Sequence, residues 1–128
     1  MQKIVFKGTV FSGKGEGRQF IELPWVKSQI EEKLGFTPYS GTLNIRLTKE
    51  TSKNKKLLEN TKNFKIYPEK GYCTGLLIKS RLDRLDCAII LPQMTHYPSD
   101  VLEVISKVCL RDRLKILDGD AVTVSVDA

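Results

Sequence analysis

Two polar residues at alternate positions, Thr42 and Asn44, directly follow Gly41. The apolar Leu43 and Ile45 alternate with them, and this period of two predicts a strand with one buried face. A hydroxyl and an amide oxygen on the other face suit a hard cation that arrives already bound to phosphates. A half-exposed strand after a turn has the same pattern, so the surrounding segments must decide between a metal site and ordinary structure.

Three glycines at alternate positions, Gly13, Gly15 and Gly17, precede this strand in the chain. Glycine at this density disfavours the interiors of helices and strands, so the segment is expected to be a loop. The backbone of such a loop can approach a ligand closely, and its successive N–H groups can bind an anion. Lys14 and Arg18 add positive charge, although a flexible hairpin connection has the same pattern. The spacing matches neither a Rossmann fingerprint nor a Walker loop.

The composition is that of one globular domain with a preference for anionic partners. The chain has 128 residues, and 21 Lys and Arg against 15 Asp and Glu leave a net charge of +6. This balance favours a nucleotide, a nucleic acid or another phosphate compound without choosing among them. The N-terminus has no signal-peptide pattern, and no apolar run approaches the length of a membrane span. A cytoplasmic protein without membrane contact is expected.

The cysteines predict neither a disulfide framework nor a zinc site. Cys73, Cys87 and Cys109 are an odd number without a Cys-x-x-Cys pair, and His96 is the only histidine. Each cysteine has apolar neighbours, so all three are expected to be buried free thiols.

Most of the remaining pattern predicts strands. Short apolar or alternating segments that are expected to be strands lie at 3–10, 39–47, 64–67, 71–78, 85–91 and 121–126. The clearest helix runs from Pro24 to a stop at Gly35, and a second is expected to start near Pro98, with Glu103 one turn in. The polar segment 48–63 is interpreted as a loop with one helical turn near 56–59. Six or seven short strands with few helices indicate a small closed barrel with helices over its ends.

Seven segments spread over nearly the whole chain carry a family resemblance. They are Ser12-Gly13-Lys14-Gly15-Glu16-Gly17-Arg18, Leu23-Pro24, Leu34-Gly35-Phe36-Thr37-Pro38-Tyr39, Gly41-Thr42-Leu43-Asn44, Thr95-His96-Tyr97, Leu110-Arg111 and Asp118-Gly119-Asp120. In order and spacing they resemble the archaeal CTP-dependent riboflavin kinase family. The resemblance implies a mainly β fold, a six-stranded cradle-loop (RIFT-type) barrel. It also implies a single domain over 1–128, without the N-terminal winged-helix domain of some members.

The resemblance implies that the γ-phosphate of CTP passes to the 5′-hydroxyl of riboflavin, giving FMN and CDP, with Mg²⁺ as the metal. The residues that match nucleotide-binding positions are Lys14, Gly15, Glu16, Gly17, Arg18 and Gln19, and then Val108, Cys109, Leu110 and Arg111. The residues that match the metal ligands are Thr42 and Asn44. Those that match flavin-binding positions are Thr95 and Glu103, and Tyr97 could pack against the isoalloxazine. Glu16, Asp100 and Glu103 are the carboxylates that could serve as general base.

Elementary chemistry agrees with this assignment. Phosphoryl transfer demands mainly positioning and charge neutralisation. Two neutral ligands leave Mg²⁺ most of its charge for the phosphates and predict weak metal binding without nucleotide. The substrates riboflavin and CTP are then the partners, and a monomer is expected.

Two alternatives remain open at the level of sequence. A nucleic-acid-binding barrel would use the net charge of +6 for phosphate contacts, although the 10 aromatic residues do not form an obvious stacking row. A non-catalytic flavin- or nucleotide-binding protein would keep the fold without the reaction. The intact Gly41-Thr42-Leu43-Asn44 segment argues against this second alternative.

Overall fold

The computed structural model describes residues 3–94 and 96–127. Within these ranges the strands are β1 (Lys3–Phe11), β2 (Leu43–Leu47), β3 (Phe64–Ile66), β4 (Gly75–Leu82), β5 (Leu85–Pro92), β6 (Val101–Ile105) and β7 (Ala121–Asp127). The helical elements are α1 (Glu16–Glu22), α2 (Pro24–Leu34), α3 (Lys49–Ser52), the 3-10 helix η1 (Lys53–Asn60) and α4 (Leu110–Leu114).

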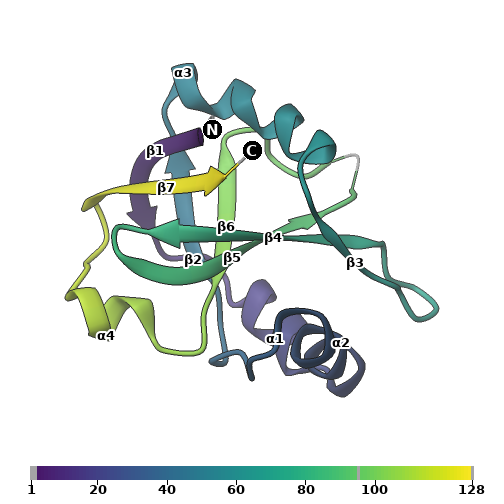
Figure 1. The fold of residues 1–128 in the computed structure, drawn as a ribbon. Helices are drawn as coiled ribbons and strands as arrows, with labels where there is room; N and C mark the ends of the chain where they lie inside the picture. The colour runs from purple at the N-terminus through teal and green to yellow at the C-terminus, as the bar shows by residue number, and fades with distance from the viewer. Residues whose placement is uncertain (1–2, 95, 128) are drawn as a thin grey trace.

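Six of these strands close into an antiparallel barrel (Figure 1). The order around the barrel is β4-β5-β6-β2-β1-β7, and β7 pairs back onto the end of β4 at Arg81↔Ser125 and Leu82↔Val124. The short β3 pairs with the other half of β4. Closure satisfies the backbone groups that an open sheet would leave at its edges. The predicted six-stranded barrel is therefore confirmed.

Two apolar clusters stabilise this barrel from inside and outside. Side chains such as Phe6, Ile45 and Val124 alternate along their strands and fill the interior. On β4 and β5 the opposite face is also buried, where Leu77 and Ile90 pack under α1 and α2. Strands buried on both faces have continuous apolar sequences, which explains the unbroken run in β5.

The helical elements occupy three separate places around the barrel (Figure 1). Leu58 of η1 and Leu110 of α4 belong to the interior cluster, so these two elements cover the barrel. Figure 1 shows α3 and η1 on one side and α1 and α2 on the opposite side. Only part of the helical structure therefore covers the barrel as expected, because α1 and α2 pack against the outer face of the sheet.

The predicted helix at Pro24 is confirmed as α2. Pro24 occupies its first turn, where the missing N–H costs nothing, and Gly35 ends it in the left-handed conformation with φ 78°. Val26 and Ile30 of this helix are fully buried against the outer face of the sheet. No helix within the described ranges is both long and apolar enough to span a membrane.

The helix expected near Pro98 is wrong, because the segment forms strand β6 (Val101–Ile105). This strand pairs with β2 on one side and β5 on the other, and four of its five residues are buried. A five-residue strand buried on both faces has no alternation, so its apolar run cannot be distinguished from that of a helix. Consequently Glu103 is a strand residue opposite Asn44.

Several other expectations need smaller corrections. The segment 48–63 is more helical than expected, since α3 and η1 together extend from Lys49 to Asn60. The strand expected at 71–78 begins at Gly75 as β4, and its hairpin with β5 is confirmed. Of the three free thiols, Cys87 is buried, whereas Cys73 and Cys109 are only half-buried.

Candidate functional site

A cavity of about 770 Å³ opens between α1, the β2–β6 pair and the connection from β3 to β4. One part of its lining is polar and comes from the glycine-rich segment, β2 and β6. Another part is apolar and aromatic and includes Phe20, Tyr72, Ile90, Pro92 and Met94. A single cavity thus joins a hydrogen-bonding wall to a surface suited to a flat ring.

A hydrogen-bonded group of Thr42, Glu103 and Tyr97 forms the polar wall. The Thr42 hydroxyl donates to Glu103 Oε1 at 3.0 Å, and the Tyr97 hydroxyl donates to Glu103 Oε2 at 2.5 Å. Asn44 lies beside them, because β2 and β6 pair in the register Asn44↔Glu103. Both carboxylate oxygens are therefore held by donors, and strand pairing sets their positions.

The environment of Tyr97 keeps its phenol protonated. Burial is the main reason that the pKa of the Tyr97 hydroxyl is raised, and the adjacent Glu103 carboxylate raises it further. The phenol consequently remains a donor to Glu103 throughout the neutral pH range.

Two glycines allow the backbone to lie against this wall. A Cβ at Gly17 would lie 2.3 Å from Thr42 Oγ1 and 2.6 Å from Glu103 Oε1. A Cβ at Gly13 would lie 2.6 Å from Asn44 Nδ2. At Gly17 a side chain would displace the wall, so close approach requires glycine there, whereas at Gly13 the contact is with the end of the Asn44 side chain.

The prediction that the whole glycine-rich segment is a loop is wrong. Gly15 adopts φ 85° immediately before α1, and Glu16 and Gly17 already belong to that helix. The packing of α1 against the barrel offsets the helix penalty of Gly17, about 1 kcal/mol relative to alanine. The alternate glycines correctly predicted that the backbone comes close to other groups, but they did not predict that Gly17 belongs to a helix.

The three arginines that line the cavity all have acidic partners, and the first of them, Arg18, pairs with Glu22 at 3.2 Å. Arg46 pairs with Asp100 at 3.1 Å, and its guanidinium lies 4.6 Å from the ring centroid of Phe11. Arg111 pairs with Asp118 at 2.8 Å and donates to the Phe11 carbonyl at 3.3 Å. Arg46 was not among the predicted site residues, although its alternation with Thr42 and Asn44 placed it on their face.

The pKa of the Asp118 carboxyl is lowered, first by a hydrogen bond from the Ser12 hydroxyl and then by Arg111. The Ser12 hydroxyl donates to Asp118 Oδ2 at 2.7 Å. This carboxylate therefore connects the start of the glycine-rich segment to α4.

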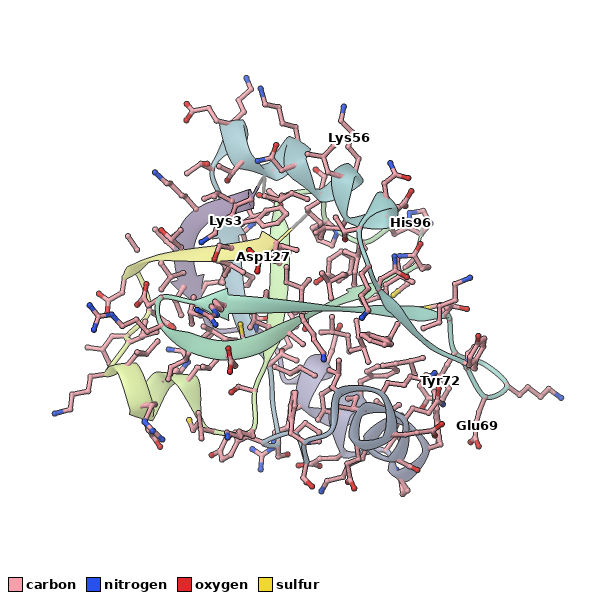
Figure 2. All side chains as sticks on the ribbon, in the orientation of Figure 1. Lys3, Lys56, Glu69, Tyr72, His96 and Asp127 are labelled. Carbon is pink, nitrogen blue, oxygen red and sulfur yellow. The ribbon has the colours of Figure 1, made fainter. Side chains whose placement is uncertain are left out.

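Three aromatic rings form the apolar end of the site. The Trp25 centroid lies 5.9 Å from that of Phe20 and 5.1 Å from that of Tyr72, both with edge-on geometry. Trp25 acts as a packing residue, while Phe20 and Tyr72 line the cavity. Figure 2 shows Tyr72 on the connection from β3 to β4, on the side of the barrel that carries α1 and α2.

The structure brings most of the predicted site residues together. Those that line the cavity are Lys14, Gly15, Glu16, Gly17, Arg18, Thr42, Asn44, Tyr97, Glu103 and Arg111. Among the described residues, Gln19, Val108, Cys109, Leu110 and Asp100 do not line it. Leu110 is buried in the barrel interior, and Asp100 is paired with Arg46. Thr95 lies outside the described residues.

The donor set of the polar wall fits a magnesium ion that brings its own phosphate ligands. Within the described ranges no cluster of three or more His, Cys, Asp or Glu residues could hold a metal alone. The Thr42 hydroxyl uses its proton toward Glu103, which leaves its lone pairs for a cation. The Asn44 side chain lines the same cavity. Oxygen donors of this kind are those that Mg²⁺ prefers.

Comparison with known proteins identifies the family. The model for CTP-dependent riboflavin kinase (CTP-dep_RFKase, Domain of unknown function DUF120) matches residues 10–126. A protein named riboflavin kinase from Archaeoglobus fulgidus is 43% identical over 130 residues, covering 96% of this chain and 54% of that protein. Proteins of the same name from Methanosarcina mazei and Pyrobaculum aerophilum are each 39% identical, covering 91% and 93% of this chain and 53% and 59% of theirs. The chain thus spans about half the length of the curated relatives it matches. It belongs to the CTP-dependent riboflavin kinase family.

Proposed function

We propose that this chain is a CTP-dependent riboflavin kinase, which transfers the γ-phosphate of CTP to the 5′-hydroxyl of riboflavin. The observation that carries the proposal is the cavity in which Thr42, Asn44 and Glu103 stand beside a glycine-rich segment and open toward an aromatic surface. A phosphoryl transfer between a nucleotide and a flavin needs this combination in a single site. Membership of the family and relatives named riboflavin kinase support it further.

The nucleotide phosphates occupy the polar end. Gly13 and Gly17 leave the backbone free of side-chain bulk where it faces Asn44 and Thr42. Lys14 and Arg18 supply positive charge from the same segment, with Arg18 also paired to Glu22 at 3.2 Å. Backbone N–H groups and cations neutralise the charge that spreads over a transferring phosphoryl group.

The cytosine base extends out of the cavity past Arg111 toward the backbone of the segment 108–110, which does not itself line the cavity. Arg111 lines the cavity, while Leu110 anchors α4 in the barrel interior. Backbone donors and acceptors before α4 can read the edges of a pyrimidine, because they present a fixed pattern of hydrogen bonds.

The isoalloxazine occupies the aromatic end. Phe20, Tyr72 and Met94 offer an apolar surface, and the Trp25 ring packs against Phe20 and Tyr72. The ribityl chain then runs toward Glu103 and Tyr97 on the polar wall. A flat heteroaromatic ring buries a large area on such a surface.

Thr42 and Asn44 are the residues that would hold Mg²⁺. When bound, the ion supplies charge neutralisation for the β- and γ-phosphates and a template for their orientation. This chain contributes the positions of the two oxygens, which are set by β2 and by the hydrogen bond from Thr42 to Glu103.

Glu103 orients the acceptor hydroxyl and is the strongest candidate for the general base. It lines the cavity next to Thr42, whereas Glu16 lies at the exposed start of α1 and Asp100 is engaged by Arg46. Both of its oxygens keep lone pairs after accepting from Thr42 and Tyr97. A loose transition state needs little assistance from a base, so orientation is the larger contribution.

The decisive experiment incubates the protein with riboflavin, Mg²⁺ and each nucleoside triphosphate in turn, with FMN and the nucleoside diphosphate separated by chromatography. FMN is expected with CTP. Absence of FMN with every nucleotide would refute the kinase assignment, and FMN with ATP alone would reject CTP as donor. A gel shift of DNA or RNA with a steep salt dependence, in the absence of kinase activity, would favour a nucleic-acid-binding barrel.

A further inference from the structure

Lys55 differs from the other lysines of the segment 49–62. Lys49, Lys53, Lys56 and Lys62 are exposed, whereas Lys55 is half-buried. Figure 2 shows Lys56, its neighbour on η1, projecting away from the barrel. The charged residues of this segment therefore do not form a uniform solvated surface, and one ammonium group is directed inward.

The Lys55 ammonium contacts the chain at the start of β6. It donates to the Val101 carbonyl at 2.7 Å and to the Pro98 carbonyl at 3.1 Å. It also lies 4.8 Å from the ring centroid of Tyr97. The ammonium group therefore hydrogen-bonds two backbone carbonyls and lies over one aromatic ring, and these three contacts hold the segment 97–101 in place.

This position costs the lysine some of its solvation. Burial lowers the pKa of the Lys55 ammonium, and the Asp100 and Glu103 carboxylates oppose that shift. Part of the attraction that keeps Lys55 charged thus comes from the carboxylate in the candidate active site.

The contacts form a continuous path from η1 to the polar wall. Lys55 holds the ring of Tyr97, the Tyr97 hydroxyl donates to Glu103 Oε2, and Glu103 Oε1 accepts from Thr42. Because Tyr97 holds Oε2, the other carboxylate oxygen is directed toward Thr42. Loss of the hydrogen bonds from Lys55 to the Pro98 and Val101 carbonyls would let the Tyr97 phenol move. The Glu103 carboxylate could then rotate away from its present position.

We infer that Lys55 is a positioning residue for the Glu103 carboxylate and acts on it through Tyr97. The inference rests on the proposed function, since the consequence of misplacing Glu103 is a loss of phosphoryl transfer to riboflavin. Lys55 does not line the cavity, so it has no direct contact with either substrate there. Its effect is on the position of the Glu103 carboxylate, which is proposed to orient the 5′-hydroxyl of riboflavin.

The test compares Lys55→Met, which keeps the aliphatic stem, with Lys56→Met as a matched control on the same element. For Lys55→Met we expect kcat/KM for riboflavin to fall about tenfold and KM for CTP to stay within about twofold. Lys56→Met should match the parent protein. A rise in KM for CTP as large as the fall in kcat/KM for riboflavin, or an unchanged Lys55→Met enzyme, would overturn the inference.

A double-mutant cycle separates positioning from general stability. If Lys55 acts through the phenol, Lys55→Met should cost much less activity in a Tyr97→Phe background than in the parent protein. Additive losses would show an independent structural role and reject the path through Tyr97. Lys55→Arg retains the cation and donors and should recover part of the activity, which keeps the cycle usable if Lys55→Met fails to fold.

A readout without substrates distinguishes failure of this inference from failure of the proposed function. The chain has four tyrosines, so labelling the tyrosine Cζ gives four signals, and Tyr97→Phe assigns one of them. The Tyr97 signal should shift in Lys55→Met and not in Lys56→Met. An unmoved signal overturns the positioning role even in an active kinase. A moved signal supports the Lys55–Tyr97 coupling even if FMN never forms.

Discussion

The polar wall and the aromatic end of the cavity are built by different means. Thr42, Asn44 and Glu103 lie on or beside two paired strands, and the ladder between β2 and β6 sets their spacing. Phe20 and Tyr72 come from a short helix and a connection, and ring packing on Trp25 positions them. Backbone hydrogen bonds place atoms to within tenths of an ångström, whereas ring packing tolerates small shifts.

This difference matches the chemistry proposed for each end. Phosphoryl transfer depends steeply on the position of charged oxygens, while binding a flat ring depends mainly on buried area. Substitutions in the wall should therefore change turnover, and substitutions at the aromatic end should change affinity.

The largest effect is expected for Gly17→Ala. Helix propensity favours alanine by about 1 kcal/mol, but the added Cβ would collide with Thr42 and Glu103. We expect kcat/KM to fall at least about 100-fold, because a displacement of the wall of about 1 Å has that consequence. Ser28→Ala, at an exposed position of α2, is the control for helix propensity and should remain active. A fully active Gly17→Ala enzyme would contradict the close approach.

The next effect is expected for Thr42→Val, which keeps the shape and removes the hydroxyl. Glu103 Oε1 loses its donor and the proposed metal site loses an oxygen, so kcat should fall about 100-fold. Thr42→Ser retains the hydroxyl and should keep most of the activity. Riboflavin binding, followed by quenching of flavin fluorescence, should change little in either variant. If Thr42→Val retains full turnover, the assignment of Thr42 is wrong.

A smaller and different effect is expected for Tyr72→Leu at the aromatic end. Loss of the ring removes contact area and its packing on Trp25, so KM for riboflavin should rise about fivefold with kcat unchanged. Tyr67→Leu, at a more exposed tyrosine nearby in the chain, serves as the control. A fall in kcat for Tyr72→Leu would contradict the expectation that the aromatic end affects riboflavin affinity and the polar wall affects turnover.

The smallest effect is expected at Asp118, outside both ends. Its folded-state pKa is lowered by Ser12 and Arg111, so its contribution to stability is present above the unfolded pKa and lost as pH falls through the folded pKa. Asp118→Asn should therefore have a slightly lower melting temperature than the parent at neutral pH. The difference should shrink from about pH 5 toward pH 3. Asp127→Asn, at the exposed end of β7, is the control. A constant difference across this range would contradict the sign of the pKa shift.

Particular elements explain where sequence reasoning succeeded and failed. The barrel strands with one buried face, such as β1 and β7, and the capped helix α2 were predicted because their patterns are local. Strand β6 was mistaken for a helix because both of its faces are buried: Leu102 and Val104 point into the barrel interior, and Ile105 belongs to the outer cluster with α1 and α2. Helix α1 was missed because Gly17 is unfavourable in a helix, and only its close contact with Thr42 and Glu103, which are distant in sequence, explains the glycine.

The same division holds for the candidate site. Thr42, Asn44 and the alternate glycines stand out in the sequence because their residue types imply oxygen ligands and close backbone approach. Arg46 was overlooked although it alternates with Thr42 and Asn44, whereas Lys55 had no such signal, since a lysine in a polar segment is most often solvated. Only the fold brings Lys55 to the carbonyls of Pro98 and Val101.

The sequence by itself determined which groups this chain can offer, namely neutral oxygens, a backbone without side-chain bulk and carboxylates, together with most of the strands that carry them. The tertiary structure decided which of these groups meet. Barrel closure pairs β2 with β6, places Glu103 opposite Asn44, and sets Tyr97 between Lys55 and Glu103. Contacts between residues about 60 positions apart, such as Thr42 and Glu103, depend on pairing across the whole barrel, which no local pattern specifies.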